Sequence, residues 1–132
     1  MNAAIAPNPK HHAVMIVDDY PELLQTVARM LHKSGYSNVL QATNALDCIH
    51  LARTNVIDTI LLDISMPGMS GMEACRILRS SAINKRAHII ACTANTNMRH
   101  QDSFFDAGFN DLLLKPFGYQ ELMDKLAAAP NN

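Results

Sequence analysis

Short apolar runs alternate along the chain with segments in which apolar residues return every three or four positions. An apolar run that stops at a turn is typical of a strand buried on both faces, and the longer periodic segments predict amphipathic helices. The predicted strands are residues 13–17, 37–42, 56–62, 88–92 and 109–114. The predicted helices are one that starts after Asp19 and ends at Gly35, then 44–53, 70–79, a segment from Asn95 or Thr96 to about Ala107, and 117–128.

This alternation, with short connections, predicts an α/β fold: a doubly wound, five-stranded parallel sheet with helices on both faces. There is no internal repeat, low-complexity tract or linker between domains, so we expect one folded domain over residues 12–129. Residues 1–11 are expected to form a flexible N-terminal leader. The pair His11-His12 is interpreted as a solvated pair at the edge of that leader rather than as a metal site.

Two helix starts are predicted from local signals. Asp19, followed by Pro21 and by Glu22 three positions on, has the pattern of an N-cap with a capping box. Pro116 can open the last helix, because its missing N–H would be unpaired at that position anyway.

Composition narrows the class of protein. The net charge is −1 and the 11 basic residues are scattered, which gives no case for direct nucleic-acid binding. The three cysteines, Cys48, Cys75 and Cys92, form no close pair and suggest neither a disulfide framework nor a zinc site. No segment has the roughly 20 apolar residues that a membrane span needs, and residues 1–12 are not a signal peptide. We therefore expect a cytoplasmic protein.

The run of residues 60–62 stops at a single carboxylate, Asp63, and a turn rich in Pro, Gly and Ser follows. The carboxyl end of an interior strand is where open α/β sheets bind ligands. A carboxylate buried there needs a cation, a donor or a proton. The competing interpretation is that Asp63 only caps the next turn, and on this stretch alone the two are equally good.

Other strand ends decide between them, because a parallel sheet brings those ends to one edge. Strand one is followed by Asp18 and Asp19, strand four by Thr93, and strand five by Lys115. Crowded carboxylates repel and require a bound cation or a raised pKa, and oxygen ligands with room for water favour Mg²⁺. Taken one at a time, these residues have simpler interpretations. Asp18 and Asp19 could cap a helix, Thr93 could be a turn hydroxyl, and Lys115 could be a solvated residue at the end of a strand. Together they indicate phosphoryl transfer onto a carboxylate nucleophile.

With these residues in place, the sequence closely resembles the receiver domain of two-component response regulators. The matching residues are Asp18-Asp19, Asp63, Met66-Pro67-Gly68-Met69-Ser70-Gly71, Thr93-Ala94 and Lys115-Pro116. The resemblance implies a (βα)5 flavodoxin-like fold with strand order 2-1-3-4-5. It also implies that Asp63 is the phosphoacceptor, and that the Lys115–Pro116 bond is cis.

The remaining implied roles concern the cofactor and the phosphoryl group. The resemblance implies Mg²⁺ held by Asp19, Asp63 and the backbone carbonyl of Ser65, with Asp18 acting mainly through water. Thr93 would hydrogen-bond the phosphoryl group and Lys115 would pair with it.

Leu112 departs from the family pattern, because a Tyr or Phe usually stands three residues before the lysine and is coupled to the threonine as a switch. That coupling is in doubt here, and Leu112 fits plain core packing. Ser65 and Asn95 stand where the family varies residues that tune the lifetime of the acyl phosphate. Residues 91–95 resemble the receivers of hybrid histidine kinases, which hints at a phosphorelay.

The hypothesis is a stand-alone receiver that accepts a phosphoryl group from the phosphohistidine of a histidine kinase or a histidine phosphotransfer protein. It would signal to a downstream protein through the face formed by helix four, strand five and helix five, and it would not be an enzyme toward other substrates. One rival is a Mg²⁺-dependent phosphohydrolase of the haloacid dehalogenase type, but such enzymes have a second Asp where Ser65 stands. Two further hypotheses are an interaction module without phosphorylation and a receiver excised from a hybrid kinase.

Overall fold

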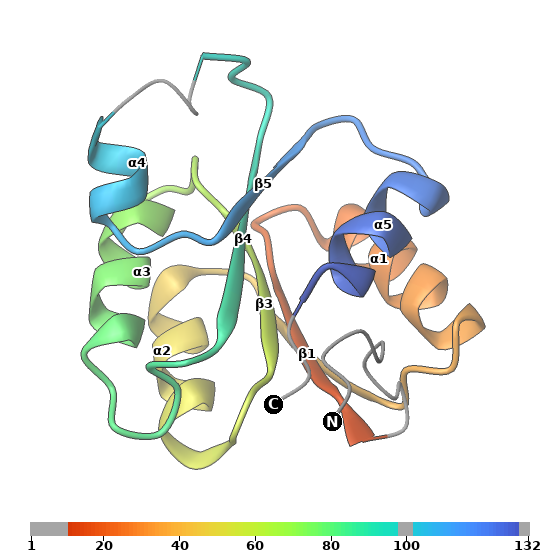
Figure 1. Cartoon of the computed structure of the whole chain (residues 1–132), viewed down its shortest axis with the longest axis horizontal. Coiled ribbons are helices and arrows are strands. Elements are labelled where there is room, and N and C mark those ends of the chain that lie inside the picture. The colour runs from red at the N-terminus through yellow and green to blue at the C-terminus, as the bar shows by residue number, and fades with distance from the viewer. Residues whose placement is uncertain (1–10, 98–101, 130–132) are drawn as a thin grey trace.

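The computed structural model of the chain describes residues 11–97 and 102–129, and within them it has a five-stranded parallel sheet (Figure 1). The order β2-β1-β3-β4-β5 confirms the expected fold class and topology. The leader expected at residues 1–11 lies almost wholly outside the described residues. The strands are β1 (Ala13–Val17), β2 (Asn38–Ala42), β3 (Thr59–Asp63), β4 (His88–Thr93) and β5 (Asp111–Leu114). The helices are α1 (Pro21–Lys33), α2 (Ala45–Thr54), α3 (Gly71–Arg79), α4 (Asp102–Asp106) and α5 (Tyr119–Ala127).

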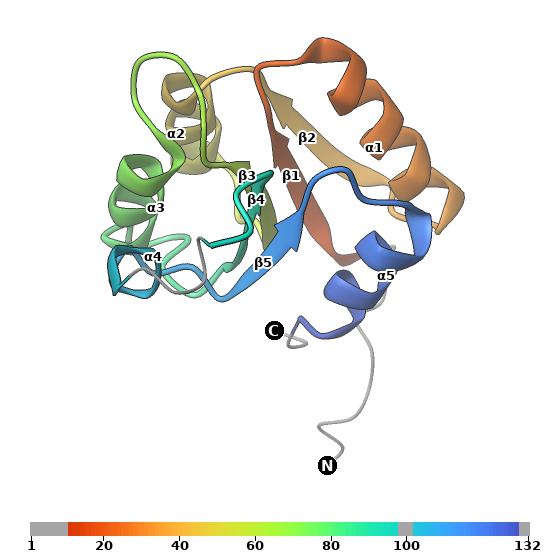
Figure 2. The same ribbon diagram turned by 90° about the horizontal axis from the view of Figure 1, so that it is seen from above.

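Helices cover both faces of the sheet, with α2, α3 and α4 on one side and α1 and α5 on the other (Figures 1 and 2). Successive residues of a central strand therefore belong to different cores. Met15 packs with the α2–α4 layer, whereas Val14 and Ile16 pack with α1 and α5. Because strand side chains alternate between faces, a strand covered on both sides must be apolar at every position. This explains the uniform runs in the sequence.

The predicted start of α1 is wrong in one respect. The N-cap is Tyr20, which makes no side-chain capping bond, and Asp19 is not the cap. The neighbouring Asp18 instead accepts the backbone N–H of Tyr20 through Oδ1 (2.9 Å). The Asp18 carboxylate, which directly follows β1, thus binds backbone at the edge of the sheet, and no carboxylate caps α1.

The predicted start of the last helix is also wrong, whereas that of the fourth falls partly outside the described residues. Asn95 and Thr96 lie in a turn, in which the Asn95 side chain accepts the N–H of Asn97 (2.9 Å), and α4 is described from Asp102 onward. Helix α5 begins at Tyr119 rather than next to Pro116, and the Glu121 carboxylate accepts the backbone N–H of Gly118 at the N-cap (2.8 Å).

At the amino ends of the strands, which we call the amino edge, polar side chains bind one another. His12 is buried, not solvated as expected, and its Nε2 lies 2.7 Å from Thr59 Oγ1. His11 is exposed. The buried Asn84 accepts the N–H of Ile57 (2.9 Å) and donates to two carbonyls, those of Ala52 and Asn55.

Arg79, at the end of α3, ties the connections of the amino edge together. Its guanidinium donates to the backbone carbonyls of Gly108 (2.8 Å), Lys85 (2.9 Å) and Ala87 (2.6 Å), and to the amide oxygen of Asn110. One side chain thus joins α3 to the loops before β4 and β5. No helix within the described residues is both long enough and apolar enough to cross a membrane.

Candidate functional site

The ends of β1, β3, β4 and β5 bring the expected polar residues to one edge of the sheet. The registers that align them pair Val17 with Leu62, Asp63 with Cys92, and Thr93 with Leu114. As a result, one carboxylate oxygen each from Asp18, Asp19 and Asp63 lie within 4.8 Å of one another. We call the group Asp18, Asp19, Asp63, Thr93 and Lys115 the acidic site.

Asp63 lies at the floor of the acidic site and is only 4% exposed. Its Oδ1 accepts the backbone N–H of Ser65 (3.2 Å) and lies 3.5 Å from Lys115 Nζ. Burial raises the pKa of the Asp63 carboxyl to about 6, and the charge of Asp18 adds to that rise, while Lys115 opposes it. An added cation would offset the same burial and repulsion.

Lys115 is already engaged by a carboxylate. Its Nζ lies 2.7 Å from Asp18 Oδ2, and Asp18 Oδ1 accepts the N–H of Tyr20. Burial by itself would lower the pKa of Lys115, but the hydrogen bond to Asp18 and the charges of Asp18 and Asp63 outweigh it and raise that pKa. Both oxygens of Asp18 therefore have partners, whereas Asp19 is exposed and has no hydrogen bond or ion pair among the described residues.

Thr93 ends β4 beside Asp63, and its side chain is buried. Its Oγ1 accepts the backbone N–H of Asn95 (3.1 Å), so the hydroxyl proton remains available to a ligand. A cleft of about 390 Å³ opens above these groups, with Asp19, Asp63, Thr93 and Lys115 in its wall.

The loop after β3 is held close to Asp63 by Gly71. The Gly71 N–H donates to the carbonyl of Ile64 (3.0 Å), and a Cβ at Gly71 would lie 2.3 Å from the backbone oxygen of Asp63. Only a residue without a side chain fits there. The loop thereby keeps Ser65 beside the acidic site.

The donor set fits a hard divalent cation. Three carboxylates face one ammonium in the acidic site, so the cluster retains negative charge. Oxygen ligands with room for water suit Mg²⁺ better than zinc or copper.

The model for the response regulator receiver domain family matches residues 14–127 of the chain. The chain belongs to this family. The receiver is 36% identical over 116 residues to the transcriptional regulatory protein YvrH of Bacillus subtilis, which covers 88% of this chain and 48% of YvrH. It is 33% identical over 115 residues to the response regulator MprA of Mycobacterium sp. strain KMS, which covers 87% of this chain and 49% of MprA. The receiver thus spans about half the length of these curated relatives.

Two solved structures resemble the receiver over nearly its whole length. The chemotaxis response regulator CheY4 of Vibrio cholerae superposes with a TM-score of 0.83 at 27% identity, covering 89% of this chain and 97% of that one. The receiver domain of the sensor histidine kinase PA1611 from Pseudomonas aeruginosa gives a TM-score of 0.81 at 30% identity, covering 91% and 98%. That structure has a magnesium ion in its active-site cleft.

The cis bond before Pro116 was implied by the resemblance, and the packing of Leu112 was expected where the chain departs from it. The Lys115–Pro116 peptide bond is cis. Leu112 is only 6% exposed and belongs to the core between the sheet and α2–α4, consistent with plain packing. Ser65 and Asn95 are exposed and line the cleft of the receiver.

Sequence reasoning missed Tyr20 as a residue of the cleft. Its side chain is 68% exposed, and Tyr20 lines the cleft next to Asp19. The signal was its position in the turn between β1 and α1, directly after the two carboxylates, since open α/β sheets bind ligands beyond the carboxyl ends of their strands.

Proposed function

We propose that this receiver is a phosphorylation switch in which Asp63 accepts a phosphoryl group from a phosphohistidine. The observation that supports this best is the position of the Asp63 carboxylate. It is buried at the floor of an open cleft, beside an ammonium and a backbone N–H. The donor would be a histidine kinase or a histidine phosphotransfer protein, and the reaction would take place in the cytoplasm.

In the transfer, an oxygen of the Asp63 carboxylate attacks phosphorus. The P–N bond of the phosphohistidine breaks, and the electron pair leaves on the imidazole nitrogen. The Lys115 ammonium and the Thr93 hydroxyl are the groups of this chain that meet the phosphoryl oxygens. Because phosphoryl transfer depends mainly on position and charge neutralisation, these two groups supply much of what the protein must provide.

Magnesium would be held by the carboxylates of Asp19 and Asp63 and the carbonyl of Ser65. Asp18 would act through water, because its two oxygens already accept from Tyr20 and Lys115. When bound, the ion supplies positive charge to the phosphoryl oxygens.

The switch would start at Thr93. A phosphoryl group on Asp63 adds roughly −1.5 to −2 charges, and the Thr93 hydroxyl can turn its proton toward it. The buried Leu112 cannot follow as an aromatic switch would, so the signal would pass through the loop after β4 to the α4–β5–α5 face. Neutral side chains at Ser65 and Asn95 would set the lifetime of the acyl phosphate.

The test is incubation with acetyl phosphate, or with beryllofluoride as a phosphoryl mimic, with and without Mg²⁺. With acetyl phosphate, we expect the intact mass to rise by one phosphoryl group only when Mg²⁺ is present, and Asp63→Asn to abolish the gain. Asp47→Asn, an exposed carboxylate on α2, is the matched control and should retain it. Catalytic turnover of phosphate esters would instead support the hydrolase hypothesis, and no response to either reagent would support the module without phosphorylation.

Magnesium binding has a separate readout in the unphosphorylated protein. When the free concentration of Mg²⁺ is 100 times its Kd, binding stabilises the folded state by about 2.7 kcal/mol. We expect Mg²⁺ to raise the Tm and Asp19→Ala to remove the effect. An unchanged Tm in excess Mg²⁺ would contradict the metal site.

A further inference from the structure

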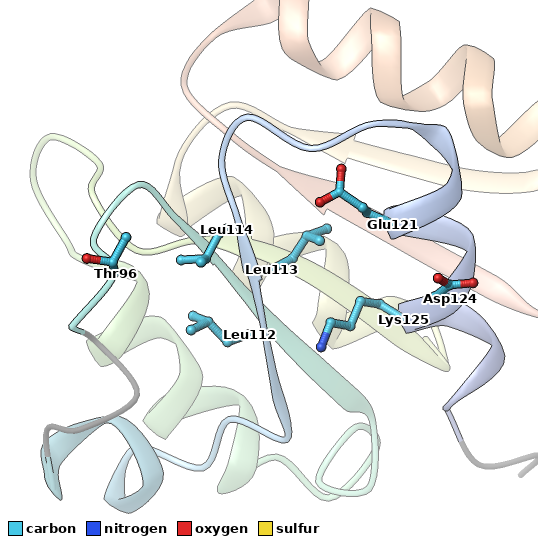
Figure 3. Close-up of a pocket in the computed structure, with 7 residues that line it drawn as sticks. All are labelled: Thr96, Leu112, Leu113, Leu114, Glu121, Asp124 and Lys125. Carbon is cyan, nitrogen blue, oxygen red and sulfur yellow. The ribbon is translucent and has the colours of Figure 1, made fainter.

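A second hollow, of about 510 Å³, lies along the outer edge of β5 and is separate from the cleft of the acidic site (Figure 3). Its floor is made by the leucines of β5. Leu112 and Leu113 are buried, but Leu114 remains 40% exposed although it is a large apolar side chain. Figure 3 shows the strand running between α5 and the loop that carries Thr96. The size lies in the range of pockets that bind ligands or side chains.

The rim of this hollow is acidic on the α5 side. Glu121 and Asp124 are exposed, and neither is in an ion pair among the described residues. Within the described part of the chain, Lys125 is the cation that lines the hollow, and its Nζ lies 2.9 Å from Asp111 Oδ1, so its charge is offset there. Leu114 lies on the Thr96 side of β5, and the two carboxylates lie across the strand on α5 (Figure 3). A ligand that spans the strand with an apolar group and a cation fits both sides of the hollow.

An added strand is not the occupant that this edge favours. The N–H of Leu112 donates to the side chain of its neighbour Asp111 (2.8 Å), which Lys125 also holds. Covering an edge N–H with a charged side chain is a known way to block strand pairing. The strand is also only four residues long. Recognition by side chains in the hollow is therefore favoured over backbone pairing.

We propose that this hollow binds a segment of a partner protein that presents an apolar side chain next to a lysine or arginine. The apolar side chain contacts Leu114, and the cation lies between Glu121 and Asp124. The proposal rests on the proposed function, since it assigns the chemistry of the partner at the α4–β5–α5 face.

The same hollow is connected to the acidic site through the loop after β4. Thr96 lines the hollow, and it lies three residues after Thr93. The backbone between them is held by the bond from the Asn95 N–H to Thr93 Oγ1. A phosphoryl group that draws in the Thr93 hydroxyl therefore moves the wall of the hollow and alters the affinity for the partner segment.

The experiment is an NMR titration of the ¹⁵N-labelled full chain with two synthetic peptides of equal length. One carries leucine flanked by lysines, and the other carries the same leucine flanked by glutamates. We expect the lysine peptide to shift amide signals of β5 and α5, and the glutamate peptide to leave them unchanged. Equal shifts with both peptides, shifts confined to α2 and α3, or self-association of the chain without peptide would overturn the proposal.

Charge-matched variants separate recognition from general attraction. Glu121→Gln/Asp124→Asn should weaken binding of the lysine peptide at least tenfold, and the amide oxygen introduced at position 121 can still accept the N–H of Gly118. Glu22→Gln/Glu73→Gln removes two exposed carboxylates on α1 and α3 and should change binding less than twofold. Equal losses in both double variants would overturn the site, as would unchanged binding in Leu114→Ser whose spectrum shows the native fold.

The titration is then repeated with beryllofluoride and Mg²⁺, with ¹⁹F NMR reporting whether the protein is loaded. Failure to load contradicts the proposed function, while the titration without beryllofluoride still decides the peptide site. In the loaded protein we expect at least a threefold change in peptide affinity. The same affinity in both forms would overturn the connection through Thr96.

Discussion

At the carboxyl edge of the sheet, the carboxylates of Asp18, Asp19 and Asp63 crowd around one ammonium and open onto a cleft. At the amino edge, polar side chains bind one another and the backbone. Arg79 alone donates to three carbonyls and a side-chain amide, and His12 is bonded to Thr59. The amino edge thus pairs most of its polar groups internally and holds the fold, although Nε2 of the half-buried His88 lacks a hydrogen-bond partner among the described residues. The carboxyl edge retains unbalanced charge, which a ligand can offset.

The largest expected loss of stability comes from removing the hydrogen bonds of Arg79 at the amino edge. Arg79→Met removes all four hydrogen bonds of the guanidinium and leaves carbonyl acceptors unpaired, which should lower the free energy of unfolding by about 3 kcal/mol or more. Urea denaturation measures it. Arg76→Met, on an exposed position of the same helix, is the control and should stay within about 0.5 kcal/mol. Similar losses in both would mean that the bonds of Arg79 do not hold the edge.

A slightly smaller effect is expected at the carboxyl edge. Gly71→Ala places a Cβ against the backbone oxygen of Asp63, and the resulting overpacking should cost about 2–3 kcal/mol. Since the loop that carries Ser65 must move, Mg²⁺ affinity should fall at least tenfold. Gly118→Ala is the control, because the nearest atom to its Cβ lies at an ordinary 3.6 Å. Isothermal titration and urea denaturation measure the two quantities, and native Mg²⁺ affinity in Gly71→Ala would contradict the prediction.

The two edges of the sheet should also differ in how their titratable groups change the stability of the protein as the pH falls. Burial lowers the pKa of both His12 and His88 below 6.5, although Asp58 and Asp111 oppose it; Arg79 adds to the lowering for His88. As pH falls below 6.5, the unfolded chain therefore takes up protons first, and the free energy of unfolding falls until the folded pKa values are reached. The double variant His12→Gln/His88→Gln should lose less stability between pH 7.5 and 5.5 than the unsubstituted protein.

Comparing the double variant with the unsubstituted protein removes the contributions that other titratable groups make to the pH dependence of stability. Asp63, whose pKa is raised to about 6, works in the opposite direction, because the folded state then binds its proton more readily. That contribution is present in both proteins and cancels in the difference between their pH profiles. Urea denaturation at each pH gives the profiles, and identical slopes would show that the amino edge does not respond to acid.

The smallest effect concerns the start of α1. Tyr20 is an N-cap without a side-chain bond, whereas Asn44 and Ser70 cap α2 and α3 with one. Tyr20→Ser supplies the missing acceptor and should stabilise the fold by about 0.5–1 kcal/mol. Thermal unfolding measures the gain. Ser70→Ala should give a loss of similar size, and a Tm that falls in Tyr20→Ser would show that the Tyr20 ring contributes more than a cap.

The sequence predicted that the side chains of the acidic site meet at one edge of the sheet, because the evidence for this is local. Each of Asp63, Thr93 and Lys115 follows an apolar run, and parallel topology alone brings such ends together. The amino edge could not be predicted in this way. His12 and Thr59 are 47 residues apart, and Asn84 reaches a carbonyl 32 residues away. Nothing in the composition around either residue marks it as buried.

The wrong start of α1 has a related cause. Asp19 is of a residue type that caps helices, but the same type also forms turns and ligand sites at strand ends. Where a strand leads directly into a binding edge, the two uses compete, and propensity alone does not choose between them. The hollow beside β5 was also not predicted, because its shape depends on how α5 packs beside that edge strand in three dimensions.

The depth at which His12 is embedded also matters to anyone who attaches a probe. Strand β1 begins one residue later and runs five residues before reaching Asp18, a span of roughly 16 Å. A fluorophore attached to the exposed side chain of His11 would therefore sit at the amino edge, away from the cleft. Labelling there should leave docking by the proposed phosphodonor unobstructed.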